Sequence, residues 1–285
     1  MFIINYEVAW YILNLVKNDN RELQQRMLQL RDYKVVKSND LIQKSRFLLS
    51  LQEQKIILFI ISKIKPNDEN FFTLNFSIQE FCKVCGIDET NGKNYKNIKD
   101  TIKSLSDKSV WLKLENDTET LVRWINKAWI SSKSGSIEIR IDDDMKPYLL
   151  QLQERFTQYE LLYTLAMRSQ YSIRLYELLK SYEYQHKKIF DIDELKRLLS
   201  AENYIRFPDF KRKVLDIAFR ELNDLSDMTV SYRIIKEGRR FAKIEFSMRI
   251  KKELDERLKT WARIDKVICP SQQSLYDKIY SDNVD

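Results

Sequence analysis

One amphipathic stretch decides the fold: "FPDFKRKVLDIAFRELNDLS" at residues 207–226. Its apolar residues recur at three- and four-residue steps, which predicts a helix with one buried side. The residues of that side are Phe210, Val214, Ala218, Leu222 and Leu225. At about 100° of turn per residue, a second set lies on the opposite side: Arg212, Lys213, Asp216, Arg220 and Asn223. That side is cationic and polar, so it is either a solvated helix surface or a surface for a polyanion.

The composition favours a globular, helix-rich chain with a local basic surface. A length of 285 residues is enough for two domains, each with its own core. Only 4 Gly and 4 Pro are present, which favours helices over irregular loops. The formal net charge is +7, and 13 Lys or Arg against 7 Asp or Glu between Asn203 and Lys252 give +6 of it. Such a concentrated charge indicates nucleic-acid binding more strongly than a diffuse one.

Cysteine usage and the N-terminal residues predict a cytoplasmic protein. Cys82, Cys85 and Cys269 form no even disulfide framework, and no secretory leader is recognisable. The apolar stretch "MFIINYEVAWYILNLVKN" at residues 1–18 is interrupted by polar residues and is shorter than the roughly 20 residues of a membrane span. We interpret it as a helix that packs on the body or on a second subunit, with membrane contact as the alternative.

The first half of the chain predicts three helices followed by a hairpin. A long helix is expected over residues 39–64, and a short one in "FSIQEFCKVCGI" at residues 76–87, where Ser77 and Glu80 have capping-box spacing. "NYKNIKDTIKSLSDKSV" at residues 94–110 predicts the third helix. The strand-like runs that follow, up to residue 141, predict the hairpin.

The same order recurs about 115 to 120 residues later, which indicates a duplicated domain. "FDIDELKRLLS" from Phe190 matches "FSIQEFCKVCG" from Phe76, and "LSDMTV" at residues 225–230 matches "LSDKSV" at residues 105–110. Alternating runs on either side of the turn "KEGRR", which contains Gly238, predict the second hairpin. Between the copies, residues 156–185 predict a long amphipathic helical region.

Three helices followed by a two-stranded hairpin form a winged helix, a variant of the helix-turn-helix. The fold class we predict is therefore α+β and helix-rich, with two tandem winged-helix domains. In this design the third helix enters the major groove and basic residues of the hairpin reach phosphates. The predicted DNA-binding residues of the second copy are Lys211, Arg212, Lys213, Asp216, Arg220, Lys236, Arg239, Arg240 and Lys243. Those of the first copy are Lys93, Lys96, Asn97 and Lys103.

The two cationic helices differ in chemistry. Lysine is a point charge suited to phosphate, whereas the arginine fork can read guanine bidentately. We therefore expect the first domain to position the protein and the second to specify the sequence, unless the first helix is only solvated or lies in a subunit interface. Asp216 could accept from a cytosine amine or pair with Arg212 or Arg220, and pairing is favoured.

The chain resembles the iteron-binding initiator replication proteins of theta-replicating plasmids, the family of the RepE and pi initiators. The resemblance covers residues 34–252. The stretches that carry it are "VVKSNDLIQKSRFLLSLQEQKIILFIISKI" at 35–64, "MKPYLLQLQERFTQY" at 145–159, "SQYSIRLYELLKSY" at 169–182 and "FPDFKRKVLDIAFRELN" at 207–223. No single motif is diagnostic, but four in this order, together with the duplication, make the resemblance specific.

The resemblance implies a plasmid replication initiator that binds double-stranded origin DNA at iterons. It implies a first winged-helix domain at residues 34–150 for backbone contacts and dimerisation, and a second at residues 151–252 for base-specific contacts. Residues 1–33, expected to be a helical extension, and the tail at residues 253–285 lie outside the pattern. Implied partners are a homodimer in equilibrium with the monomer, the host initiator and the replicative helicase, and no membrane.

Enzymatic alternatives lack their usual residues. A rolling-circle nickase needs a tyrosine beside a metal held by paired histidines, and the sequence has only His186. No GxxxxGK[ST] phosphate loop is present. We expect Cys82 and Cys85 to pack in the core, and "DDD" at residues 142–144 to begin a helix. We therefore expect no enzyme, no catalytic residue, no metal and no cofactor, with a winged-helix transcriptional repressor or an origin-nicking enzyme as alternatives.

Overall fold

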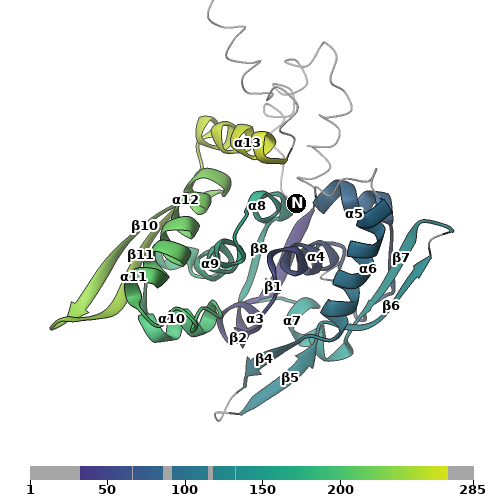
Figure 1. Cartoon of the computed structure of the whole chain (residues 1–285), viewed down its shortest axis with the longest axis horizontal. Coiled ribbons are helices and arrows are strands. Elements are labelled where there is room, and N and C mark those ends of the chain that lie inside the picture. The colour runs from purple at the N-terminus through teal and green to yellow at the C-terminus, as the bar shows by residue number, and fades with distance from the viewer. Residues whose placement is uncertain (1–32, 66, 86–91, 115–117, 132, 269–285) are drawn as a thin grey trace, which may run out of the picture.

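The computed structural model describes residues 33–65, 67–85, 92–114, 118–131 and 133–268, and all structural statements below concern these. Figure 1 shows two modules, with the first half of the chain on the right and the second half on the left. Between them lie strands β1 (Lys34–Ser38) and β8 (Phe156–Glu160). The two strands pair antiparallel, from Lys34 opposite Glu160 to Ser38 opposite Phe156.

The strand β8 corrects the helical region expected over residues 156–185. Only α8 (Leu161–Ala166), α9 (Gln170–Lys180) and the 3-10 turn η3 (Glu183–Gln185) are helical. Within β8 buried and exposed residues alternate, with Thr157 and Tyr159 inside. This period of two is that of a half-buried strand.

The long helix expected over residues 39–64 is also divided. It consists of α3 (Asn39–Gln43), β2 (Ser45–Arg46) and α4 (Leu51–Ser62). The break is explained by Ser50, whose side chain accepts from the Glu53 amide at 3.3 Å. The Glu53 carboxylate in turn accepts from the Ser50 amide at 2.7 Å. This capping box starts α4 at Leu51.

The next helices follow the expected order. After β3 (Leu74–Ser77) come α5 (Ile78–Cys85) and α6 (Gly92–Ser106). The predicted cap of α5 is confirmed, because the Ser77 hydroxyl accepts from the Glu80 amide at 2.9 Å. The Glu80 carboxylate does not complete the box in the usual way and instead contacts Lys63 and Tyr33.

The single hairpin expected in the first module is in fact two hairpins. The strands are β4 (Ser109–Lys113), β5 (Glu119–Arg123), β6 (Ile125–Ser131) and β7 (Ser136–Ile141). They belong to two sheets of order β2-β4-β5 and β3-β7-β6. The division falls at Trp124, whose side chain is buried in the core. The 3-10 turn η2 (Asp143–Met145) and α7 (Lys146–Leu149) follow.

The second module repeats this plan with one hairpin. Its elements are β9 (Lys187–Asp191), α10 (Ile192–Leu198), the helical segment from Phe207 to Leu225, β10 (Met228–Glu237) and β11 (Arg240–Ile250). Its sheet has the order β10-β11-β9, as the first module has β6-β7-β3. In both modules, the strand before the second helix pairs with the last strand of the hairpin, which confirms the duplicated winged-helix architecture.

The two modules share one continuous core. Buried apolar side chains from β1 to α13 (Leu254–Ile268) form a single cluster. Part of the expected tail, residues 254–268, is therefore a helix on the body: α13 packs on α8 and α12, with Trp261 and Ile264 buried. The extension expected at residues 1–33 lies outside the described part, except for Tyr33. None of the described helices is long and apolar enough to cross a membrane.

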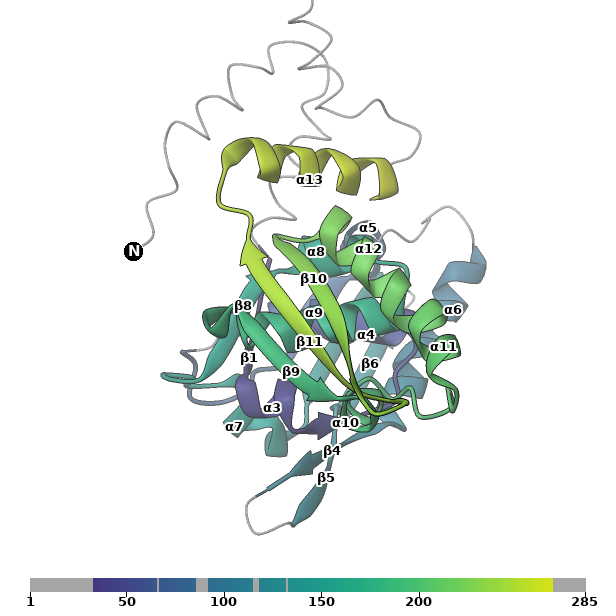
Figure 2. The same cartoon turned by 90° about the vertical axis from the view of Figure 1, so that its left-hand side faces the viewer.

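The third helices of both modules lie toward the same side of the molecule. In Figure 1 they flank α4 and α9, and in Figure 2 α6, α11 and α12 lie on the right while α3 and α7 lie on the left. One side of the protein thus presents both helices, as a surface for one extended partner requires.

Candidate nucleic-acid interface

The helix predicted at residues 207–226 has a π-helical turn in its middle. It begins as α11 (Phe207–Phe210), continues as η4 (Lys211–Leu215) with π-helical bonding, and ends as α12 (Asp216–Leu225). The predicted buried side is confirmed. Its members are at most 7% exposed: Phe210, Val214, Ala218, Leu222 and Leu225.

The arginines of the opposite side point into solvent. The Arg212 side chain is 73% exposed and meets only Asp209, at 3.4 Å. Arg220 is exposed, and its Nε donates to the main-chain oxygen of Asp216 at 3.3 Å. Exposed ion pairs contribute little, typically about 0–1 kcal/mol. A phosphate or guanine could therefore replace these contacts at small cost.

Lys213 is exposed beside them, and its ammonium lies 5.7 Å from the centre of the Tyr204 ring. No described carboxylate forms an ion pair with Lys213 in the structure. It is thus the least engaged cation of the π-helical turn, as a phosphate contact would require.

Asp216 is engaged within the protein, and its partners are not the expected ones. Its carboxylate accepts from Lys211 Nζ at 2.8 and 2.9 Å and from the Tyr232 hydroxyl at 2.6 Å. Partial burial acts to raise the pKa of Asp216, but the hydrogen bonds from Lys211 and Tyr232 outweigh it and hold the pKa below its ordinary value. The expected pairing with Arg212 or Arg220 side chains is wrong.

Lys211 is correspondingly engaged in the bond to Asp216. The hydrogen bond to Asp216 raises the pKa of the Lys211 ammonium, so that it stays charged. Asn223, expected on the free side, is also engaged: its amide nitrogen donates to Phe219 and Val230 main-chain oxygens, and its oxygen accepts from the Val230 amide at 2.9 Å.

The wing formed by β10 and β11 carries the four predicted cations near its tip. Arg239 follows Gly238, which adopts a positive φ of 62° in the turn, and no described carboxylate pairs with it. Arg240 meets Asp193 at 2.9 Å and Lys243 meets Glu237 at 3.3 Å, both as exposed pairs. Lys236 lies 4.8 Å from the centre of the Phe241 ring.

The first module offers fewer defined cations. Lys96 and Lys103 are exposed on α6, as predicted. Lys93 and Asn97 belong to α6, but their side chains lie outside the described part. The described face of α6 therefore carries two lysines separated by two turns, which suit phosphates along a backbone, with the exposed Asp100 between them.

Two exposed residues of this side were not among the predicted DNA-binding residues. Arg206 is the exposed N-cap of α11, and no described carboxylate pairs with it. Ile205 beside it is 87% exposed. The residues that begin a recognition helix contact base edges in helix-turn-helix proteins. The signal for Arg206 was its place directly before the Phe207-Pro208 helix start, inside the basic region.

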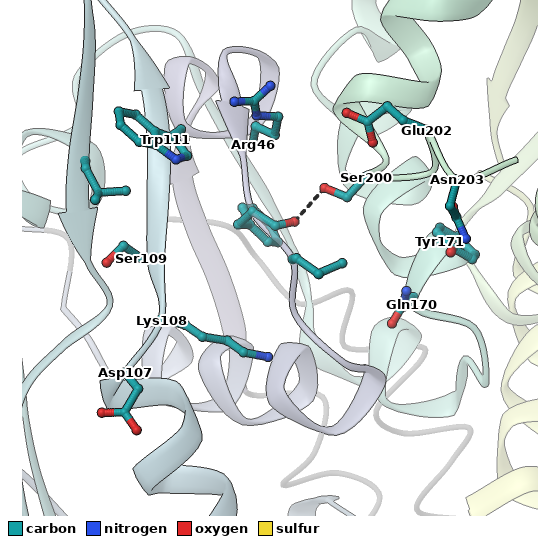
Figure 3. A pocket seen from close by; sticks show the side chains of 13 residues that line it. Arg46, Asp107, Lys108, Ser109, Trp111, Gln170, Tyr171, Ser200, Glu202 and Asn203 are labelled. Carbon is teal, nitrogen blue, oxygen red and sulfur yellow. Dashed lines mark hydrogen bonds between the residues drawn. The ribbon is translucent and has the colours of Figure 1, made fainter. Parts of the chain in front are cut away.

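An open groove of about 920 Å³ separates the two modules. Figure 3 shows Arg46, Lys108 and Trp111 of the first module across from Tyr171 and Asn203 of the second. The Ser200 hydroxyl bridges the modules by donating to the Phe47 main-chain oxygen at 2.8 Å. The groove was not predicted, because it depends on how the modules pack.

The residues considered for enzymatic chemistry have structural roles. Cys82 is buried in the core as expected, while the Cys85 side chain lies outside the described part. The Asp142 side chain accepts from the Asp144 amide at 3.1 Å and caps η2, which confirms the helix-start interpretation. Among the described residues, no three His, Cys, Asp or Glu side chains gather as a possible metal site.

The fold and this side together define a class of protein: a tandem winged-helix protein with two third helices and a cationic wing on one side. The model of the family "Initiator Replication protein, WH1" matches residues 34–180, and that of "Initiator Rep protein, WH2" matches residues 191–248. The first alone spans more than half of the chain. The chain therefore belongs to the initiator replication protein family.

Similar individual proteins agree with this assignment. A replication initiation protein of Escherichia coli is 29% identical over 233 residues, which are 78% of this chain and 71% of that protein. The PI protein of Escherichia coli is 30% identical over 145 residues, 44% of this chain and 47% of that protein. The crystal structure of the Pi initiator protein in complex with iteron DNA has the same fold, with a TM-score of 0.65 and 23% identity over 78% of this chain and 99% of that one.

Proposed function

We propose that this initiator binds iterons in double-stranded plasmid origin DNA through the side that carries both third helices. The observation that carries the proposal is the exposed set of cations on the helix from Phe207 to Leu225 and on its wing. Arg212 and Arg220 supply forks of the kind that read guanine, and Arg239 supplies a charge for phosphate. The structure of the similar Pi initiator was determined with iteron DNA, which supports the same class of ligand here.

The modules divide the work in this proposal. The first, residues 34–150, contacts the DNA backbone and forms a homodimer in equilibrium with the monomer. The second, residues 151–252, makes the base-specific contacts. A dimer is supported by apolar side chains exposed on the first module, where Leu48 is 67%, Leu121 52% and Trp111 41% exposed.

The remaining expectations complete the proposal. The protein acts in the cytoplasm, without a cofactor and without catalytic chemistry of its own. It recruits the host initiator and the replicative helicase, which supply the chemistry of replication. The assigned family of replication initiators supports this division of labour.

The direct test asks whether the DNA that flanks the gene carries direct repeats and whether the protein binds them. The full chain should protect a repeat of about two helical turns, and its affinity should fall by about 10³ or more between low and moderate salt if six or more phosphates are contacted. Arg220→Ala should weaken binding by about 5- to 150-fold, or about 1–3 kcal/mol, and relax the base preference at one position. Protection of random DNA with the same affinity would contradict the proposal.

Replication assays separate this function from the alternatives. A folded Arg212→Ala variant should lose plasmid replication from the origin, whereas a change in promoter output alone would favour a transcriptional repressor. With supercoiled origin DNA and Mg²⁺ or Mn²⁺, the DNA should remain closed. Relaxed circles linked covalently to the protein would instead identify an origin-nicking enzyme.

A further inference from the structure

The wing is fastened to the recognition helix at three places along its length. Near the wing tip, the Phe241 ring stacks on the Phe207 ring, with centroids 4.4 Å apart and planes 23° apart. Phe207 is the first residue of α11, so this stack joins the start of the helix to the part of the wing that carries Lys236.

The second fastening is in the middle of the helix. The Tyr232 hydroxyl of β10 donates to the Asp216 carboxylate at 2.6 Å, and Lys211 donates to the same carboxylate. The Tyr232 ring also packs edge-on against Phe219 of α12, with centroids 5.6 Å apart. A half-buried side chain of the wing is therefore held by both a polar and an apolar contact.

The third fastening is at the base of the wing. Asn223 exchanges hydrogen bonds with the main chain of Val230, at 2.9 and 3.0 Å. From Phe207 to Asn223 the three contacts span 16 residues, or about 24 Å at the 1.5 Å rise of an α-helix. A hairpin held at its base, middle and tip cannot swing independently of the helix.

At the middle contact, a lysine is paired with the Asp216 carboxylate, which a hydrogen bond to Tyr232 alone would not require. A carboxylate on a DNA-facing helix repels phosphates. Lys211 lies directly on this carboxylate and neutralises it. Because Lys211 pairs with it, the Asp216 carboxylate can accept from Tyr232 without adding a net negative charge to the DNA-facing side.

We propose that Tyr232 and Asp216 are positioning residues that make the helix and the wing one rigid reading unit, so that base contacts and wing phosphate contacts form together. The inference rests on the proposed function and deepens it. In this proposal Asp216 contacts no base, and Lys211 pairs with Asp216 and not with DNA. The free energy of the wing contact depends on the Tyr232–Asp216 bond, although Tyr232 itself does not touch DNA.

A double-mutant cycle tests the inference with the full chain. The probe is a duplex recovered by selection from a random pool with the wild-type protein, titrated by fluorescence anisotropy. Arg239→Ala should weaken binding by about 3- to 10-fold in the wild-type background. In the Tyr232→Phe background the same change should weaken binding by less than about 2-fold, because the loosened wing no longer presents the arginine. Tyr232→Phe alone should weaken binding by about 3- to 10-fold.

The matched control is Tyr184→Phe, which removes an exposed hydroxyl on η3, a turn beside the Met248 end of β11 and far along that strand from the wing tip. It should change neither the affinity nor the Arg239 effect. If the effects of Tyr232→Phe and Arg239→Ala multiply fully, the two residues are independent and the inference is wrong, whatever Tyr232→Phe does to thermal stability.

A second variant keeps the test decisive if Tyr232→Phe folds poorly. Asp216→Asn keeps an oxygen that can accept from Tyr232, so it should retain most of the coupling to Arg239 and leave the base preference of the selected duplex unchanged. Loss of the wild-type preference at one base would show that Asp216 reads DNA directly and would overturn the inference.

The outcomes also separate this inference from the proposed function. Failure to select any duplex, or no loss of affinity in Arg220→Ala, would overturn the proposed function and the inference with it. Selection of a duplex whose binding needs Arg220, combined with an additive cycle, would overturn the inference alone.

Discussion

The two modules share helix order and sheet pairing, yet the side-chain contacts of their third helices differ. In the second module, the helix is tied forward to its wing through Phe241, Tyr232 and Val230. In the first, α6 is tied backward to α4, because the Glu53 carboxylate accepts from the Ser104 hydroxyl at 2.6 Å. Both third helices also pack on a body helix and on a hairpin strand, α12 on α9 and β10 and α6 on α4 and β6. The contrast therefore lies in these hydrogen bonds and ring contacts.

This difference matches the two roles that the cations suggest. A helix and wing that form one unit can hold arginine forks at fixed positions relative to base edges, which direct readout requires. A helix anchored to the body and carrying Lys96 and Lys103 needs only to lie along the phosphates. In the proposed function, the contacts of the third helix, and not the winged-helix order itself, distinguish the reading module from the positioning one.

The largest expected effect tests whether the modules are separable at all. Arg174 of α9 is 3% exposed and donates to the main-chain oxygens of Ile42 at 2.7 Å and Ser45 at 2.9 Å in the first module. It also donates to Leu198 in the second, at 3.1 Å. Arg174→Ala leaves these oxygens without their donor inside a shared core, so the free energy of unfolding should fall by about 3 kcal/mol or more.

Chemical denaturation measures that loss, and hydrogen exchange shows where it acts. If the modules are one cooperative unit, amides of β7 and of β11 should both exchange faster in Arg174→Ala. Faster exchange in β11 alone would mean that the modules unfold separately. The exposed Arg168, six residues earlier, provides the matched control: Arg168→Ala should change stability by less than about 0.5 kcal/mol.

A smaller effect is expected from the bond that anchors α6. Burial acts to raise the pKa of Glu53, but hydrogen bonds from Lys108, Ser104 and Ser50 outweigh it and lower the pKa to about 2. A folded-state pKa below the unfolded value contributes stability above about pH 5 and loses it as the pH falls toward 2. Glu53→Gln should therefore cost about 1–2 kcal/mol at pH 7 and almost nothing near pH 2.

Urea unfolding of both proteins across this pH range checks the prediction. The exposed Glu69 supplies the control, since Glu69→Gln should leave the curve between pH 2 and pH 7 unchanged. If Glu53→Gln lowers the free energy of unfolding by the same amount at every pH down to pH 2, the shape of the side chain matters and its charge does not.

Local periodicity predicted the side of the recognition helix that is buried, but it could not predict the partners of Asp216. Residues five apart in a regular α-helix point about 140° away from each other, so Lys211 and Asp216 should not meet. The π-helical turn at Lys211–Leu215 bonds residues five apart and brings them to one side. The amino-acid pattern carries no signal for such a turn, since the apolar spacing of residues 207–226 is that of a regular α-helix.

Long-range partners explain the other differences. The alternation in residues 156–160 is too short to outweigh the helical pattern that follows, and only pairing with β1, about 120 residues earlier, makes this segment a strand. The additional β4–β5 hairpin of the first module likewise depends on the pairing of β4 with β2. In contrast, the Ser77 cap and the Gly238 turn were predicted, because their contacts lie within three or four residues.

The smallest expected effect compares the two third helices as DNA ligands. Lys96→Ala and Lys103→Ala should each weaken binding by less than about 1 kcal/mol, equally for every sequence, and should reduce the salt slope by about one for each phosphate that is no longer neutralised. Arg220→Ala should weaken binding to the selected duplex more than binding to random DNA. The exposed Lys34 on β1 is the control, and Lys34→Ala should leave both affinity and salt slope unchanged.

Titrations of selected and random duplexes at several salt concentrations distinguish the two kinds of loss. A lysine that only neutralises phosphate changes both affinities by the same factor, because a phosphate contact carries no sequence information. If Lys96→Ala or Lys103→Ala instead lowers the ratio of specific to random binding, α6 reads bases as well. In that case, anchoring a third helix to the body would be as effective for recognition as fastening it to a wing, and the distinction between the modules would rest on their side chains alone.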